Sequence, residues 1–139
     1  MSGERQPVWV GRAAIVILPV EIDLANAELV RQDLLSVVTQ GATRVIADMT
    51  ATTFCDSAGI AVLVRVVQRA TARGSGLRLA ASAPAVTRVL ALTGIDKLIG
   101  VYPSVAAALA DPGDDPAADE TAPSAPGQAG SAGRAQQPG

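Results

Sequence analysis

The 139-residue sequence contains no histidine and only one cysteine, Cys55. Without histidine the chain cannot build a Ser–His–Asp or Cys–His catalytic centre. A zinc site with cysteine and histidine ligands is excluded for the same reason. A single cysteine permits no disulfide within the chain, which fits a reducing compartment, and we expect the cytoplasm. These absences therefore exclude histidine-based catalytic centres and a zinc site built from cysteine and histidine.

Aromatic residues are also scarce and are limited to Trp9, Phe54 and Tyr102. The chain therefore has few platforms on which nucleic-acid bases could stack. Its formal net charge is −2, and residues 1–110 carry ten basic and eight acidic side chains without forming a basic stripe. We therefore expect no binding to nucleic acid.

Long hydrophobic runs are absent as well. The longest run, residues 13–20, is too short to cross a membrane. It is followed by Glu21 and Asp23, where a signal peptide would have a cleavage site of small residues. We therefore expect no association with a membrane.

The chain does contain a regular alternation of strand-like and helix-like segments. The predicted strands are residues 8–10, 13–19, 44–48 and 77–79, with an edge strand at 99–102. The predicted helices are residues 26–40, 57–73, 84–93 and 105–110. This order predicts an α/β domain in which a mixed, partly parallel sheet of four to five strands packs with about four helices.

Helical spacing also predicts which side of each helix is buried. In the first helix the apolar residues at 27, 30, 34 and 37–38 share one face, and Asn26 is a suitable N-cap. In the second helix we expect four buried residues, Ile60, Leu63, Val64 and Val67. We expect its polar residues to face solvent, namely Arg65, Gln68, Arg69 and Arg73.

The composition changes abruptly after Ala110. Residues 111–139 hold five of the nine prolines, five of the thirteen glycines and no Val, Leu, Ile or aromatic residue. They also carry five acidic side chains and a single arginine. Such a segment has almost no apolar surface with which to offset the entropy of ordering its backbone. We predict a domain of residues 1–110 followed by a disordered acidic tail, residues 111–139.

The stretch from Asp48 to Ile60 carries the strongest functional signal. Asp48 ends a predicted strand, a short loop follows, and Asp56-Ser57 opens the second helix. Functional sites in α/β sheets gather at such strand ends, and we expect several unpaired backbone N–H groups beside an exposed Ser57. Gly59 is expected to keep the first turn slim enough for another protein to approach. A phosphate on Ser57 would add about −1.5 to −2 charges. A helix N-terminus tolerates such a charge, whereas a docked partner does not.

Each of these residues also has a purely structural interpretation. Asp and Ser are the commonest helix N-caps, so Asp56 and Ser57 could serve only to start the helix. Asp48 could cap its loop, and Asp23 the helix that follows it. Cys55 fits a small buried hydrophobic residue better than a redox sensor. The residues alone leave both interpretations open.

Taken in order, the motifs resemble the signature of the STAS domain, the fold shared by anti-sigma factor antagonists and the cytoplasmic tails of sulfate transporters. The family pattern is an apolar strand ending in Asp, a short loop, and Asp-Ser-(Ser/Thr/Ala)-Gly-(Leu/Ile)-x-x-Leu. Here it reads Asp48 … Asp56-Ser57-Ala58-Gly59-Ile60-Ala61-Val62-Leu63.

Two further stretches are similar to family elements, so that the resemblance covers about residues 8–110. They are Leu18-Pro-Val-Glu21-Ile22-Asp23 and Ser82-Ala-Pro84 … Leu92-Thr-Gly94-Ile95. Two departures are small: Val20 replaces the usual Gly, and Ala58 replaces the commoner Ser or Thr.

The resemblance implies an anti-sigma factor antagonist. The unphosphorylated protein would bind an anti-sigma factor that is also a serine kinase, and would so free a sigma factor for transcription. The kinase would phosphorylate Ser57, and a serine phosphatase would reverse the modification. The partner-binding residues that the resemblance implies are Asp23, Asp48, Asp56, Ser57 and Gly59. None of them is expected to be catalytic, and this role implies no cofactor and no metal.

Two other functions stay open at this point. The chain could be a STAS interaction subunit of a membrane transport complex, in which Ser57 is not phosphorylated. The intact Asp-Ser-x-Gly favours the switch over this alternative. An enzyme with Ser57 or Cys55 as nucleophile is disfavoured, because the only lysine is Lys97 and no Gly-x-Ser-x-Gly elbow is present.

Overall fold

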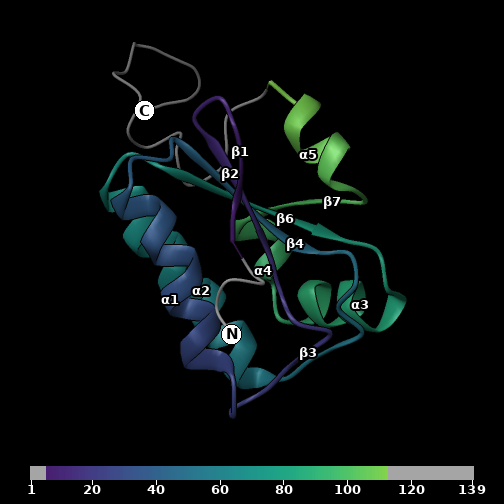
Figure 1. Cartoon of the computed structure of the whole chain (residues 1–139). Coiled ribbons are helices and arrows are strands. Elements are labelled where there is room, and N and C mark those ends of the chain that lie inside the picture. Colours follow the sequence, from purple (N-terminus) through teal and green to yellow (C-terminus); the bar gives the residue numbers. More distant parts are fainter. Residues whose placement is uncertain (1–5, 113–139) are drawn as a thin grey trace, which may run out of the picture.

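The computed structural model describes residues 6–112, and its main element is a five-stranded sheet (Figure 1). The strand order is β1-β2-β4-β6-β7, with β1 antiparallel to β2 and all other neighbours parallel. These strands are β1 (Val8–Val10), β2 (Ala13–Ile17), β4 (Arg44–Met49), β6 (Gly76–Ala81) and β7 (Gly100–Tyr102). A second, parallel ladder joins β3 (Glu21–Ile22) to β5 (Phe54–Cys55).

Five helices accompany the sheet, which confirms the predicted mixed α/β class. They are α1 (Ala27–Thr39), α2 (Ser57–Ala72), α3 (Pro84–Leu92), α4 (Ile95–Leu98) and α5 (Val105–Ala110). None of the helices within residues 6–112 combines the length and apolar character that a membrane span requires.

The main core lies between one face of the sheet and the paired helices α1 and α2. The helix α1 buries the apolar residues that its spacing predicted, among them Val30, Leu34 and Val37. They pack with alternate residues of the central strands, such as Val45 and Leu79. Figure 1 shows α1 and α2 side by side on this face, with α5 on the other side of the sheet.

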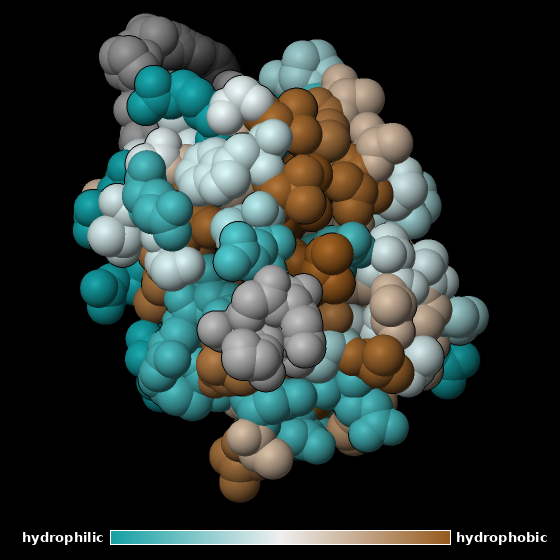
Figure 2. All heavy atoms as spheres, viewed as in Figure 1, coloured by the Kyte–Doolittle hydropathy of each residue, from teal (hydrophilic) through white to brown (hydrophobic). Residues whose placement is uncertain are grey.

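The second face of the sheet has a smaller core under α5. Ile15, Ile46 and Ala80 pack there against Ala108 of α5. The short α5 leaves the outer strands partly uncovered, and Val8, Val10 and Ile17 remain about half exposed. Apolar side chains are visible between β1 and α5 in Figure 2. The predicted strand 13–19 is therefore present as the shorter β2, and only its middle, residues 14–16, is fully buried.

A buried arginine holds α5 onto this face. Arg78 on β6 is fully buried, and its Nη1 donates hydrogen bonds to the carbonyl oxygens of Ala108, at 2.6 Å, and Asp111, at 2.7 Å. Its guanidinium lies 5.3 Å from the centre of the Tyr102 ring, and the Tyr102 hydroxyl donates to Asp111 Oδ2 at 2.7 Å. Asp111, one residue past the predicted domain end, therefore contributes to the fold. Apart from Asp111 and Pro112, the predicted disordered tail lies outside the described residues.

The sequence did not indicate β3, β5 or α4. The strand β5 falls inside the predicted connection between Asp48 and Ser57, and pairs with residues directly after β2. Strands of two residues and a helix of four residues are too short to display a hydrophobic period.

Candidate functional site

The site is formed by the two segments that leave β2 and β4 and run side by side. The backbone N–H of Thr53 donates to the carbonyl of Val20 at 2.8 Å, and that of Asp56 to the carbonyl of Ile22 at 3.1 Å. Thr52 is fully buried and its hydroxyl donates to the carbonyl of Pro19 at 2.7 Å. These bonds make the start of α2 part of a fixed unit at the carboxyl ends of the strands.

Asp56 is the N-cap of α2. Its Oδ1 accepts hydrogen bonds from the backbone N–H groups of Ala58, at 2.9 Å, and Gly59, at 3.2 Å. Ser57 is therefore the first residue of the helix, and its side chain is exposed. This corrects the expectation of several unpaired N–H groups beside Ser57, because the Asp56 carboxylate already occupies two of them.

Gly59 is required by packing within the chain. A Cβ atom at this position would lie 2.6 Å from Cys55 Sγ and 2.8 Å from Ile22 Cγ2. Gly59 is buried and lets the first turn of α2 rest directly on the β3–β5 ladder. The approach of α2 to its own chain therefore accounts for Gly59, and a contact between Gly59 and a partner stays a prediction.

Asp23 lies next to the start of α2 but serves a local turn. Its Oδ1 accepts from the N–H of Ala25 at 3.0 Å, while its own N–H donates to Asn26 Oδ1 at 3.0 Å. Asn26 precedes α1 as predicted, yet its side chain makes no cap hydrogen bond and donates instead to the carbonyl of Glu21 at 2.8 Å. Asp23 is half-buried. Because Ile22 is bonded to Asp56, the structure brings Asp23 close to Asp56 and Ser57.

Asp48 is not brought into this group. Its Oδ1 accepts from the N–H of Thr50, at 3.0 Å, and from the Thr50 hydroxyl, at 2.6 Å. Its neighbours Ala47 and Met49 point into the core under α1 and α2, so the alternation of a strand directs Asp48 to the opposite face. These hydrogen bonds fit the structural interpretation, a cap for its own loop, and a contact between Asp48 and a partner stays a prediction.

Sequence reasoning missed a set of exposed apolar side chains around Ser57. Val20, Leu24 and Phe54 are 55%, 82% and 50% exposed. Val20 precedes β3, Leu24 follows it after one intervening residue, and Phe54 belongs to β5. We call these three residues the apolar rim. Exposed apolar side chains grouped at one site are typical of surfaces that bind proteins. The signal in the sequence was the presence of large apolar residues in segments without a helical or strand period.

Cys55 is buried, as predicted. Burial, and secondarily the negative charge of Asp56, raise the pKa of the Cys55 thiol from 9.0 to about 11. A thiol that stays protonated at neutral pH is a poor nucleophile. The structure therefore favours a packing role for Cys55 over a redox role.

The first prediction separates the roles of Asp56 and Ser57. Asp56→Ala removes the helix cap and should lower the free energy of unfolding by about 0.5–2 kcal/mol. Ser57→Ala removes an exposed hydroxyl that does not cap α2. This substitution should change the free energy of unfolding by less than about 0.5 kcal/mol. Urea denaturation of the two variants, with Asp56→Asn as a capping control, measures the difference. A larger loss for Ser57→Ala than for Asp56→Ala would contradict this assignment.

The second prediction concerns alkaline pH. The unfolded chain loses the Cys55 proton near pH 9, whereas the folded protein holds it up to about pH 11. The unfolded state thus binds fewer protons between these values, and stability should fall as the pH rises through this window. The stability of Cys55→Ala should lack this part of the decline when both proteins are titrated with urea at pH 8 to 11. Parallel pH profiles for the two proteins would show that the thiol titrates normally.

Comparisons with known proteins agree with this structure. The STAS domain model matches residues 7–108. A Mycobacterium tuberculosis protein named as an anti-anti-sigma factor is 33% identical over 105 residues, which cover 71% of this chain and 68% of that protein.

Two solved proteins share the fold. An anti-sigma factor antagonist from Mycobacterium paratuberculosis is 27% identical, with a TM-score of 0.69 over 75% of this chain and 88% of its own. The Bacillus protein SpoIIAA in its phosphorylated form is 22% identical, with a TM-score of 0.58 over 75% of this chain and 95% of its own. The matched segment spans almost the whole described domain, and this chain belongs to the STAS domain family.

Proposed function

We propose that this protein is an anti-sigma factor antagonist that binds its partner when Ser57 is unmodified and releases it when Ser57 is phosphorylated. The antagonist role is supported by the names of its relatives. The switch is supported mainly by one observation: Ser57 is an exposed first residue of α2, held in place by the Asp56 cap and the β3–β5 ladder.

The surroundings of Ser57 suit a surface that another protein covers. The apolar rim supplies area that a partner can remove from water, which is worth about 25 cal/mol per Å². An unmodified serine hydroxyl at the edge of such an interface needs only one hydrogen-bond partner. Nothing in this arrangement prevents docking of the unmodified protein.

A phosphate on Ser57 makes the binding of a partner less favourable in two ways. It adds about −1.5 to −2 charges that a docked partner would have to remove from water. It also lies beside the Asp56 carboxylate, which already uses the nearest backbone donors. The phosphate is therefore directed to solvent, where it can be accommodated by the folded domain and opposes a partner that lies over the rim.

In this role the protein is a substrate and a binding partner in the cytoplasm, and it catalyses no reaction. A serine kinase, which is the anti-sigma factor itself, transfers a phosphoryl group from ATP to the Ser57 oxygen. A serine phosphatase transfers that group to water and restores the binding-competent form. The related Bacillus protein whose phosphorylated form has been solved is consistent with this cycle.

The proposal is tested by capturing partners from a lysate of the native cells with two full-length baits, Ser57→Ala and Ser57→Glu. We expect the alanine bait to retain a protein with serine kinase activity and the glutamate bait to lose it. Ser36→Glu, which places the same charge on an exposed position of α1, is the matched control and should behave like the parent. Recovery of a transport protein by both baits would support the transport-subunit alternative and overturn the switch.

A further inference from the structure

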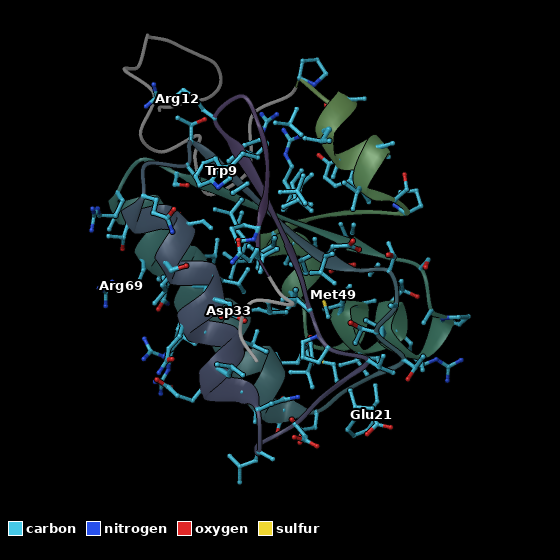
Figure 3. The ribbon with its side chains drawn as sticks, viewed as in Figure 1. Trp9, Arg12, Glu21, Asp33, Met49 and Arg69 are labelled. Carbon is cyan, nitrogen blue, oxygen red and sulfur yellow. The ribbon has the colours of Figure 1, made fainter. Side chains whose placement is uncertain are left out.

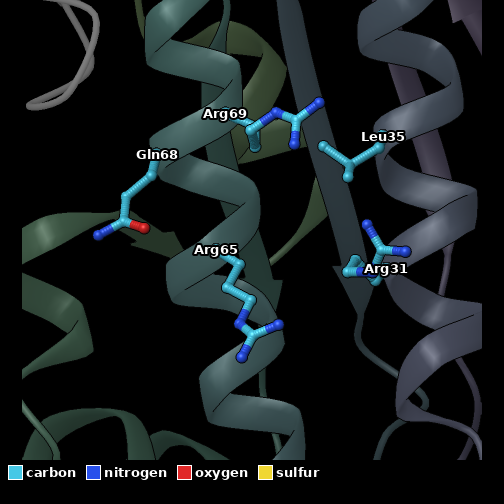
Figure 4. A pocket seen from close by; sticks show the side chains of 5 residues that line it. All are labelled: Arg31, Leu35, Arg65, Gln68 and Arg69. Atoms are coloured by element: carbon cyan, nitrogen blue, oxygen red, sulfur yellow. The ribbon is translucent and has the colours of Figure 1, made fainter.

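A basic groove runs between α1 and α2, on the side of these helices that faces away from the sheet. Its volume is about 250 Å³, and Figure 4 shows the lining residues Arg31, Leu35, Arg65, Gln68 and Arg69. None of these residues takes part in the site around Ser57.

The groove carries more guanidinium groups than there are carboxylates paired with them. Arg31 is engaged by Glu28, and this pairing, with a further hydrogen bond from Gln32, lowers the pKa of Glu28 to about 2. Arg65 and Arg69 are exposed and form no salt bridge among residues 6–112, although the charge of Arg65 also contributes to the lowered pKa of Glu28. One helical turn after Arg69, the exposed Arg73 continues the same row of guanidinium groups. We call Arg65, Arg69 and Arg73 the arginine row.

The strand topology places the C-terminal end of this row near the point where the described chain ends. The helix α2 leads into β6, and α5 follows the parallel strand β7, so both helices finish at the amino ends of the strands. Both contact β6, from opposite faces of the sheet. Two layers of about 10 Å each therefore separate the end of α5 from α2.

The residues that follow Pro112 have the length and charge to bridge that separation. Residues 113–120 include four carboxylates, Asp114, Asp115, Asp119 and Glu120, and no basic residue. Eight extended residues span at most about 26–29 Å. Asp119 and Glu120 can therefore reach Arg73 and Arg69 around the ends of the strands.

We propose that the acidic segment 113–120 docks on the arginine row of its own chain. The other end of the domain offers no comparable surface, because Glu21, Asp23 and Asp56 lie there around Ser57 and repel the segment. Figure 3 shows Glu21 at that end, with Arg12 and Arg69 toward the opposite side. The docked segment covers the Arg69 and Arg73 end of the row, and it leaves the Ser57 site free.

The contact is electrostatic and should respond to salt. The Debye length falls from about 10 Å at 0.1 M to about 3 Å at 1 M salt. A single exposed carboxylate–guanidinium pair contributes little to stability. Docking is favoured because four carboxylates in one segment face the three guanidinium groups of the arginine row.

The test compares two ¹⁵N-labelled full-length proteins by NMR. One is the parent, and the other carries Asp114→Asn, Asp115→Asn, Asp119→Asn and Glu120→Gln. We expect the amide resonances of residues 65–73 to differ between the two in dilute buffer and to coincide in 1 M NaCl. A parent protein with Arg69→Gln and Arg73→Gln should lose its sensitivity to the tail substitutions.

The control is Asp96→Asn, which removes a charge from an exposed position of α4 and should leave residues 65–73 unchanged. Identical spectra over 65–73, or shifts confined to the Ser57 end, would overturn the proposal. A difference that grows with protein concentration would assign the segment to a second copy and overturn docking within one chain. None of these readouts depends on the phosphorylation of Ser57.

Discussion

Arg78→Ala is expected to lower the free energy of unfolding by about 3–5 kcal/mol. The side chain is fully buried, so its removal leaves a cavity under α5. The carbonyls of Ala108 and Asp111 also lose their donor, and an unsatisfied buried acceptor costs about 1–3 kcal/mol. Urea denaturation followed by circular dichroism measures the loss, and weaker protection of α5 amides from hydrogen exchange should accompany it.

A milder variant keeps this prediction testable if Arg78→Ala does not fold. Tyr102→Phe removes only the hydroxyl that donates to Asp111, and should cost about 1 kcal/mol. The control is Arg88→Ala on the exposed side of α3, which should change stability by no more than about 0.5 kcal/mol. If Arg78→Ala were as mild as this control, α5 would be held by other contacts.

The second large effect is expected on binding. Ser57→Glu should weaken the complex with the anti-sigma factor by at least about tenfold, which corresponds to 1.4 kcal/mol. Ser57→Ala should bind as the parent does. The substitution removes only an exposed hydroxyl that caps nothing, and it adds no charge to the site. Titration calorimetry with the purified partner gives both affinities.

The folded state must be unaffected for this comparison to be meaningful. A helix N-terminus favours an anion, while Asp56 beside it repels one, and we expect these effects nearly to cancel in the stability of Ser57→Glu. Thermal unfolding of the variants should therefore coincide within a few degrees. Equal affinities for Ser57→Glu and Ser57→Ala would show that charge at this position does not control binding.

Much of the fold could be predicted because long elements carry a clear period. The apolar positions of α1 are buried as their spacing indicated, and Arg65, Gln68 and Arg69 of α2 face solvent as predicted. The buried face of α2 is turned from the predicted one. Ile60 and Val64 are only half-buried, whereas Val62, Val66 and Ala70 belong to the core. A helix rich in valine and alanine has apolar residues on several sides, and only the packed sheet determines which side is buried.

The candidate site was predictable in part. An exposed Ser57 at the start of α2 follows from the Asp-Ser-x-Gly pattern, and the structure agrees. The use of the Asp56 carboxylate as the cap, and the approach of Cys55 to Gly59, depend on the β3–β5 ladder, which no local period reveals.

Arg78 is a second case that local pattern could not reveal. An arginine in an otherwise apolar strand resembles a residue pointing to solvent, and only the docking of α5 buries it. Its partners Tyr102 and Asp111 are distant in sequence, and no spacing rule connects them.

The phosphorylated protein itself provides the most direct measurement of the central claim. The full-length protein is incubated with the anti-sigma factor kinase and ATP, the phosphate is mapped by mass spectrometry, and the affinity of the purified product for a catalytically inactive kinase is measured. We predict one phosphate, on Ser57, and an affinity at least about tenfold weaker than that of the unmodified protein. A phosphate on Thr52, Thr53 or another residue, or a phosphate on Ser57 with unchanged affinity, would contradict the account.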